Sequence, residues 1–235
     1  MSGPSLDALQ LTGRSRDHVI DVPEFGCALH VDVVAPFMRL RAAAARAGID
    51  LVPASGFRDF ARQRDIWNAK FNGLRPMQDR DGEVLDASQL TPATRIEAIL
   101  WWSALPGASR HHWGTDCDVY DRAALPSGVA LRLDPDEYAP DGPFAALQAW
   151  LMQYAGDYGF FRPYTTRGEG VSPEPWHLSY APIAEPCADA LSVEIMQAAI
   201  ARGEVAGAEH ILPQLGALHR RYVTGYDRPP KNFTA

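Results

Sequence analysis

Two imidazoles and two carboxylates stand together in one short stretch, Ser109-Arg110-His111-His112-Trp113-Gly114-Thr115-Asp116-Cys117-Asp118. On a β-strand, alternate side chains share a face. We expect short strands from Ser109 to His112 and from Asp116 to Tyr120, separated by a bend at Trp113-Gly114. Such a hairpin brings His111 against one of the carboxylates. The stretch therefore predicts a metal-binding unit at the centre of the fold.

A second cluster, Glu174-Pro175-Trp176-His177, supplies the groups that the first one lacks. With His111 and a carboxylate, His177 would complete a ligand set of two nitrogens and one oxygen, which suits zinc and leaves a position open for water. Glu174 is expected to act as the general base, provided that Pro175 turns the backbone so that Glu174 and His177 converge. Arg58 is the candidate to stabilise negative charge on a tetrahedral intermediate.

Composition and charge restrict the class of protein. The chain has 235 residues, of which 46% are apolar and 22% charged, and we expect one domain over residues 1–235. A net charge of -7 without a local cluster of Lys and Arg argues against nucleic acid as a partner. No apolar run is long enough for a membrane span. Since no signal peptide is visible and the three cysteines have unrelated spacings, we expect a cytoplasmic protein, with the periplasm as the alternative.

The periodicity of apolar residues predicts an α+β fold, with a small antiparallel sheet that carries the metal site and packs with several helices. We expect an irregular arm over residues 1–30, a core over about 31–185, C-terminal helices over 186–222 and a tail over 223–235. The turn-rich segment 72–90 is expected to be a surface excursion, and the role of the insertion 72–106 stays open. The core elements expected are helices over 32–47, 59–71, 91–102 and 143–157, and strands over 49–54, 116–120 and 176–180.

At these motifs the sequence resembles the VanY-like D-alanyl-D-alanine carboxypeptidases, zinc peptidases of the group that includes lysostaphin-type enzymes and the hedgehog fold. The family pattern Ser-x-His-x-x-Gly-x-Ala-x-Asp is met by Ser109, His111, Gly114 and Asp118, with Asp116 in place of alanine. Glu-x-x-His is met by Glu174 and His177, and the upstream Ser-Gly-Tyr-Arg by Ser55-Gly56-Phe57-Arg58. Three motifs in this order are more specific than any one of them alone.

The resemblance implies a role for each matching residue. It makes His111, Asp118 and His177 the ligands of one Zn2+ ion, with Glu174 as base and Arg58 as oxyanion or substrate clamp. It also implies that Ser109 and Gln63 help to bind the peptide end. From the residues themselves, we expect His112 to point away from His111 and, like Asp116, to support the ligands without binding the metal. The implied fold is the α+β fold of the hedgehog and D-Ala-D-Ala peptidase group.

The implied function is a zinc carboxypeptidase that removes the terminal D-alanine from peptidoglycan stem peptides, at a D,D or an L,D bond. A cytosolic address favours the L,D bond, because D,D-trimming there would attack the cell's own wall precursors. One alternative is an endopeptidase that cuts cross-links, although no wall-binding repeat supports it. Another is a non-catalytic, zinc-stabilised binding module, which would not need Glu174 or Arg58. A serine hydrolase built on Ser109 is weaker, because no nucleophile elbow surrounds it.

Overall fold

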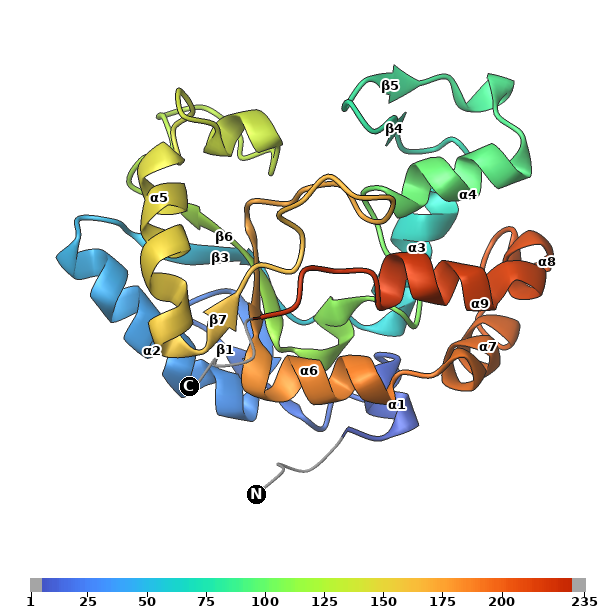
Figure 1. Cartoon of the computed structure of the whole chain (residues 1–235), viewed down its shortest axis with the longest axis horizontal. Coiled ribbons are helices and arrows are strands. Elements are labelled where there is room, and N and C mark those ends of the chain that lie inside the picture. Colours follow the sequence, from blue (N-terminus) through green and yellow to red (C-terminus); the bar gives the residue numbers. More distant parts are fainter. Residues whose placement is uncertain (1–5, 230–235) are drawn as a thin grey trace.

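A computed structural model describes residues 6–229 of the chain. At its centre lies a four-stranded antiparallel sheet (Figure 1). The strand order is β3 (Leu51–Ser55), β6 (Asp116–Asp121), β8 (His177–Tyr180) and β7 (Phe160–Phe161). In this register Asp118 lies opposite Ser55 on one side and His177 on the other. The predicted α+β class is confirmed, and the sheet itself brings distant motifs together.

Helices α2 (Val31–Arg46) and α5 (Ala145–Tyr154) pack on one side of this sheet (Figure 1). In α2 the side chains of Val33, Phe37 and Leu40 recur at helical spacing and are fully buried. They join sheet residues such as Val119 in one apolar cluster. This packing fixes the strand that carries Asp118.

A second apolar cluster lies on the other side, where Trp67, Trp113 and Met196 are fully buried. Asp59 caps the first helix of this layer and Thr91 caps the second, as expected for these residue types at helix starts. The elements are α3 (Phe60–Phe71), α4 (Pro92–Leu100), α6 (Ala181–Ala190), α7 (Val193–Ala201), α8 (Ala208–Ile211), α9 (Leu215–Leu218), a 3₁₀ turn Leu212–Gln214 and a π-helical turn His219–Val223.

The excursion 72–90 forms a small hairpin of β4 (Met77–Gln78) and β5 (Val84–Leu85), followed by a 3₁₀ turn Ala87–Gln89. Figure 1 shows this hairpin standing beyond α4, at the edge of the molecule. The indole Nε1 of Trp102 donates to the carbonyl of Asp79 at 2.8 Å and ties the hairpin to the body of the protein. Further 3₁₀ turns lie at Pro135–Tyr138 and Ala155–Tyr158.

The prediction of an irregular arm over residues 1–30 is wrong for residues 6–30, and residues 1–5 lie outside the described part. This segment contains α1 (Ala8–Leu11) and a hairpin of β1 (Val19–Val22) and β2 (Cys27–His30). The strands are too short to show a period, and their stability comes from contacts with distant segments: the amide of His30 donates to the carbonyl of Gly114 at 2.8 Å. The hairpin therefore supports the turn that carries His111.

The expected strand over Ser109–His112 is also wrong. Residues Arg110–Trp113 form a 3₁₀ turn, which ends at Gly114 with φ of 67°. The turn directs the Arg110 side chain inward, where Asp116 accepts from it at 2.8 Å. Consequently β6 pairs with β3 and β8 rather than with a strand from the same motif.

Gly114→Ala is expected to destabilise the fold. A left-handed φ costs an L-residue about 1–2 kcal/mol. In addition, a Cβ at this position would lie 2.5 Å from Cγ1 of Val19 and 2.7 Å from the amide nitrogen of His30. Gly128→Ala is the matched control, because its φ is 78° but a Cβ there meets nothing within 4 Å. Urea unfolding measures the free energy of unfolding of both variants. Both substitutions add backbone strain, but only Gly114→Ala adds a steric clash, so equal losses of stability would contradict the close packing at Gly114.

The predicted tail over 223–235 is packed as far as the structure describes it. The amide of Asp227 donates to the carbonyl of Pro163 at 2.9 Å, and its carboxylate accepts from Thr165 and Thr166. Arg228 forms an ion pair with Asp189 at 2.8 Å. Residues 230–235 lie outside the described part. Between residues 6 and 229, none of the helices combines the length and the apolar character needed to cross a bilayer.

Candidate active site

The three predicted metal ligands meet at the centre of the sheet. Nε2 of His111 lies 3.4 Å from Oδ2 of Asp118, and Nδ1 of His177 lies 3.5 Å from Oδ1 of the same carboxylate. One donor atom from each of the three side chains lies within 4.8 Å of the other two, and all three residues are buried. We call these residues the triad.

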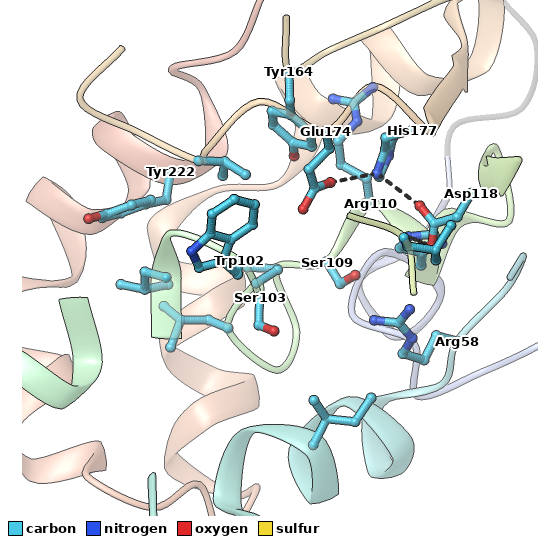
Figure 2. Close-up of a pocket in the computed structure, with 18 of the residues that line it drawn as sticks. Arg58, Trp102, Ser103, Ser109, Arg110, Asp118, Tyr164, Glu174, His177 and Tyr222 are labelled. Atoms are coloured by element: carbon cyan, nitrogen blue, oxygen red, sulfur yellow. Dashed lines mark hydrogen bonds and ion pairs between the residues drawn. The ribbon is translucent and has the colours of Figure 1, made fainter. Parts of the chain in front are cut away.

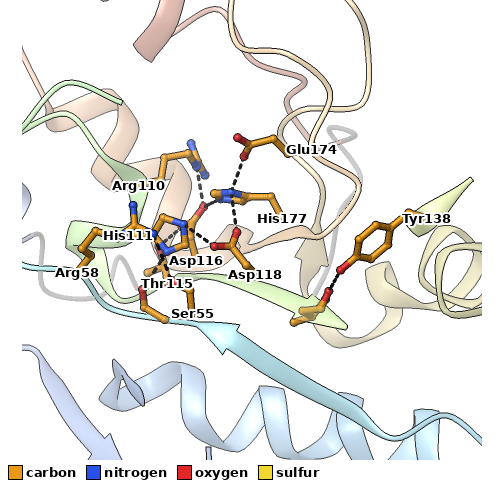
Figure 3. A network of polar contacts seen from close by, with 12 residues as sticks. Ser55, Arg58, Arg110, His111, Thr115, Asp116, Asp118, Tyr138, Glu174 and His177 are labelled. Carbon is orange, nitrogen blue, oxygen red and sulfur yellow. Dashed lines mark hydrogen bonds and ion pairs between the residues drawn. The ribbon is translucent and has the colours of Figure 1, made fainter. Parts of the chain in front are cut away.

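The imidazoles of the triad are oriented by hydrogen bonds on their outer nitrogens (Figure 3). Nδ1 of His111 donates to the carbonyl of Gly56 at 2.9 Å, and Nε2 of His177 donates to Oδ1 of Asp116 at 2.9 Å. The remaining nitrogens therefore face the carboxylate of Asp118. Two oriented imidazoles and one carboxylate form a donor set that fits zinc, and such outer partners are typical of metal-binding histidines.

Asp116 is held by a buried arginine and does not belong to the triad. Nε of Arg110 donates to it at 2.8 Å, and the same guanidinium donates to Oγ of Ser179 at 2.7 Å. Burial alone would raise the pKa of Asp116, but Arg110 and the hydrogen bond from His177 hold it well below its usual range. The carboxylate therefore stays charged and fixes the His177 ring.

Glu174 reaches the triad from the segment just before β8. Its Oε2 lies 3.1 Å from Nδ1 of His177, and the amide of His177 donates to the carbonyl of Glu174 at 3.1 Å across Pro175 and Trp176. The expected turn at Pro175 thus brings both side chains together. Burial on its own would lower the pKa of His177, but the hydrogen bonds to Asp116 and Glu174 and the charge of Asp118 raise it to about 10.

Arg58 approaches the triad from the segment after β3. Its guanidinium donates to Oε1 of Gln63 at 2.8 Å and to Oγ of Ser55 at 3.3 Å, and both partners are uncharged. Gln63 is 0% exposed, and its amide nitrogen donates to the carbonyl of Ala104 at 2.7 Å. Gln63 therefore lies behind Arg58 and holds it in place, with no open face toward a peptide.

His112 points away from the triad, as predicted. Its Nδ1 donates to the carbonyl of Arg58 at 2.6 Å, and its Nε2 accepts from the amide of Gly107 at 3.0 Å. Burial lowers the pKa of His112 to about 3, so the ring is neutral and keeps this arrangement of donor and acceptor. It fixes the backbone that carries the Arg58 side chain.

A cavity of about 440 Å³ opens beside the triad (Figure 2). Ser109, Arg58 and Glu174 line it close to the triad, and Trp102 and Tyr222 line its other end. A volume of this size is in the range that takes a small ligand or a short peptide end. Of the residues predicted to bind the peptide, Ser109 lines the cavity and Gln63 reaches it only through Arg58.

Two residues at the site were not predicted from the sequence. Arg110 stands inside the first motif, and a cation that precedes two imidazoles and two carboxylates is a signal for a buried ion pair. Tyr164 places its ring edge-on to His177, with 5.1 Å between the ring centroids, and its carbonyl accepts from the amide of Glu174 at 2.9 Å. No spacing in the sequence connects Tyr164 with either residue.

Comparison with known proteins shows the family of this chain. The family profile described as VanY, D-alanyl-D-alanine carboxypeptidase, matches residues 26–183. The chain belongs to this family. An uncharacterized protein of Haemophilus influenzae is 45% identical over 98 residues, which are 40% of this chain and 67% of that protein. A D-alanyl-D-alanine carboxypeptidase of Enterococcus faecalis is 27% identical over 154 residues, which are 64% of this chain and 47% of that enzyme.

Solved structures show the same fold. The VanYB complex with D-alanine-D-alanine has a TM-score of 0.53 at 21% identity and covers 76% of this chain and 84% of that one. A point mutant of the vancomycin resistance D,D-pentapeptidase VanY, in complex with Zn(II), has a TM-score of 0.51 at 23% identity, covering 74% and 83%. The LdcB LD-carboxypeptidase has a TM-score of 0.51 at 18% identity, covering 90% and 81%. These likenesses confirm the predicted VanY-like fold.

Proposed function

We propose that this chain is a zinc-dependent carboxypeptidase that hydrolyses the bond to the terminal D-alanine of peptidoglycan stem peptides. The observation that carries the proposal is the convergence of Glu174 with the triad at one end of a cavity. Glu174 is not needed to hold a metal, because His111, Asp118 and His177 already supply three donors. Its position is that of a base beside the place where a water molecule would attack.

Each group at the site has its own role in peptide hydrolysis. Zinc held by the triad would acidify the attacking water and polarise the scissile carbonyl. Oε2 of Glu174 accepts the proton of that water and later delivers it to the leaving amine. Asp116 keeps Nε2 of His177 protonated, and Gly56 does the same for Nδ1 of His111, so that both rings keep their orientation.

Arg58 supplies the positive charge for the oxyanion or the substrate carboxylate. Within residues 6–229 its hydrogen-bond partners are neutral, whereas the charge of Arg110 is already matched by Asp116. The Arg58 guanidinium is therefore free to bind an anion that forms or arrives in the cavity. The family relationship supports this role, which the resemblance also implies.

Arg58→Ala is expected to lower kcat about 100- to 1,000-fold, because removing one donor to the oxyanion typically costs that much. The rate of D-alanine release measures this loss, and thermal unfolding checks that the variant stays folded. Arg62→Ala is the control, since Arg62 is exposed on the outer side of α3. A kcat for Arg58→Ala close to that of the control would exclude the proposed role.

Two substrates, a muropeptide tetrapeptide and the corresponding pentapeptide, show which bond the enzyme hydrolyses. Loss of one alanine from the pentapeptide alone identifies a D,D-carboxypeptidase, and loss from the tetrapeptide alone an L,D-carboxypeptidase. Both classes occur among the structural neighbours, since VanY is a D,D-pentapeptidase and LdcB an LD-carboxypeptidase. Release of alanine from neither peptide would contradict the proposed function.

A further inference from the structure

One positive group that lines the cavity has no part in the proposed chemistry. Lys70, on α3, lines the same cavity as the triad. Among residues 6–229 its side-chain hydrogen-bond partner is the neutral hydroxyl of Ser103, which accepts at 2.7 Å. An ammonium carries three donors, so two of them remain available. Lys70 is thus a half-buried cation without a counter-charge in contact.

An unpaired charge in a half-buried position is unfavourable unless a ligand of opposite charge binds to it. Burial lowers the pKa of the Lys70 ammonium to about 8, and the charge of Glu174, which is not in contact with it, offsets this shift only in part. Arg110 is the contrasting case, because this buried cation is paired with Asp116 at 2.8 Å. The difference indicates that Lys70 faces an anion that arrives with the substrate.

The position of Lys70 separates it from the scissile end. Gln63, which anchors Arg58, lies seven residues before Lys70 on the same helix, or about 10 Å along its axis. The terminal carboxylate of a substrate lies only about 4 Å from the scissile carbonyl. Arg58 can therefore serve the groups at the scissile end, while Lys70 lies further along the wall.

The cavity also has apolar lining residues. Ile66 and Leu105 line it, and Trp102 lies beside Ser103 on the side of the cavity away from the triad (Figure 2). Such a surface accommodates methylene groups and leaves a charged end at Lys70. A ligand that fits both regions has an aliphatic part of several atoms that ends in, or leads to, a carboxylate.

We propose that Lys70 and Ser103 bind a second carboxylate of the stem peptide, distinct from the carboxylate at the scissile end. This proposal rests on the proposed function. Two carboxylates of a stem peptide have this chemistry: the side-chain carboxylate of a diaminopimelate at the third residue and the free α-carboxylate of the γ-linked glutamate. A lysine at the third residue lacks the first, and isoglutamine lacks the second.

Calorimetric titration of zinc-loaded Glu174→Gln protein tests the proposal while turnover is strongly slowed. The probes are three stem peptides with the same C-terminal bond: one with diaminopimelate and glutamate, one with lysine at the third residue, and one with isoglutamine. We expect Kd to be about 10- to 100-fold weaker for the peptide that lacks the carboxylate bound by Lys70, as for a lost charge-assisted hydrogen bond. The peptide that binds more weakly identifies the source of the carboxylate.

In the same background, Lys70→Met is expected to weaken binding of the full peptide by this factor and to abolish the discrimination, whereas Lys70→Arg retains it. Arg62→Met, on the exposed side of α3, is the control. Equal Kd values for the three peptides, or an equal effect of Lys70→Met on all of them, would overturn the proposal. A different result would contradict the proposed function itself: wild-type protein that binds the peptides but releases no alanine from them.

Discussion

Replacing Glu174 with glutamine is expected to lower kcat for D-alanine release by about 10²–10⁴, the usual contribution of a general base. Glutamine has nearly the same shape but cannot accept the proton of the attacking water. The three donors of the triad remain, because Glu174 supplies none of them, although its contact with Nδ1 of His177 changes. The variant should therefore keep its zinc while it loses activity.

Two measurements on the same preparation check this result: metal content and the rate of alanine release. Glu169→Gln is the matched control, since Glu169 is an exposed glutamate that precedes β8 in the same segment as Glu174. It should retain wild-type activity and zinc. Zinc retained with undiminished activity in Glu174→Gln would remove Glu174 from the mechanism and favour a protein that only binds metal.

Asp116→Asn is expected to destabilise the protein by about 3–5 kcal/mol, because it leaves a buried guanidinium without its partner. The side chains of Arg110 and Asp116 are only 4% and 0% exposed, so water cannot reach the guanidinium to solvate it once its partner is neutral. The substitution also weakens the acceptor that orients the His177 ring. We therefore expect zinc affinity to fall together with the free energy of unfolding.

The control for this prediction is Asp21→Asn, which breaks the ion pair between Arg16 and Asp21 on the surface. Its side chains are 57% and 74% exposed, so the expected loss is only about 0–1 kcal/mol. Urea unfolding of both variants gives the comparison. Equal losses in the two variants would show that the buried pair contributes no more than a surface pair.

The same carboxylate predicts how stability depends on pH. In the folded state the pKa of Asp116 is held below its unfolded value of about 3.9. Its contribution to stability is therefore complete above that unfolded value and is lost as the pH falls through the folded pKa. Acid unfolding of the wild type should show this loss, and Asp116→Asn should lack that part of it.

The sequence motifs predicted which side chains meet, because their chemistry depends on residue types that stand at fixed spacings. His111, Asp118 and His177 come together, and Pro175 turns the chain between Glu174 and His177 as expected. The means by which His111 arrives was predicted wrongly. A 3₁₀ turn ending at Gly114 carries it, and alternation along a strand does not describe such a turn.

Other features depend on contacts that no local pattern contains. The hairpin of β1 and β2 is fixed by distant segments such as the one around Gly114, and α6 was not predicted because Pro186 lies inside it. The cavity position of Lys70 follows from how α3 packs beside Ser103, which the spacing of apolar residues cannot show. The sequence therefore predicts the residues at the centre of the site, but not the Lys70 and Ser103 pair on the cavity wall.

The central claim is tested most directly by incubating the purified protein with tetrapeptide and pentapeptide muropeptides, with and without a metal chelator, and measuring the loss of alanine by mass spectrometry. We expect release of one D-alanine from at least one peptide, loss of this activity with chelator, and its return when zinc is added back. Chelator that removes the metal and leaves alanine release unchanged, or no release under any condition, would contradict the proposed zinc carboxypeptidase.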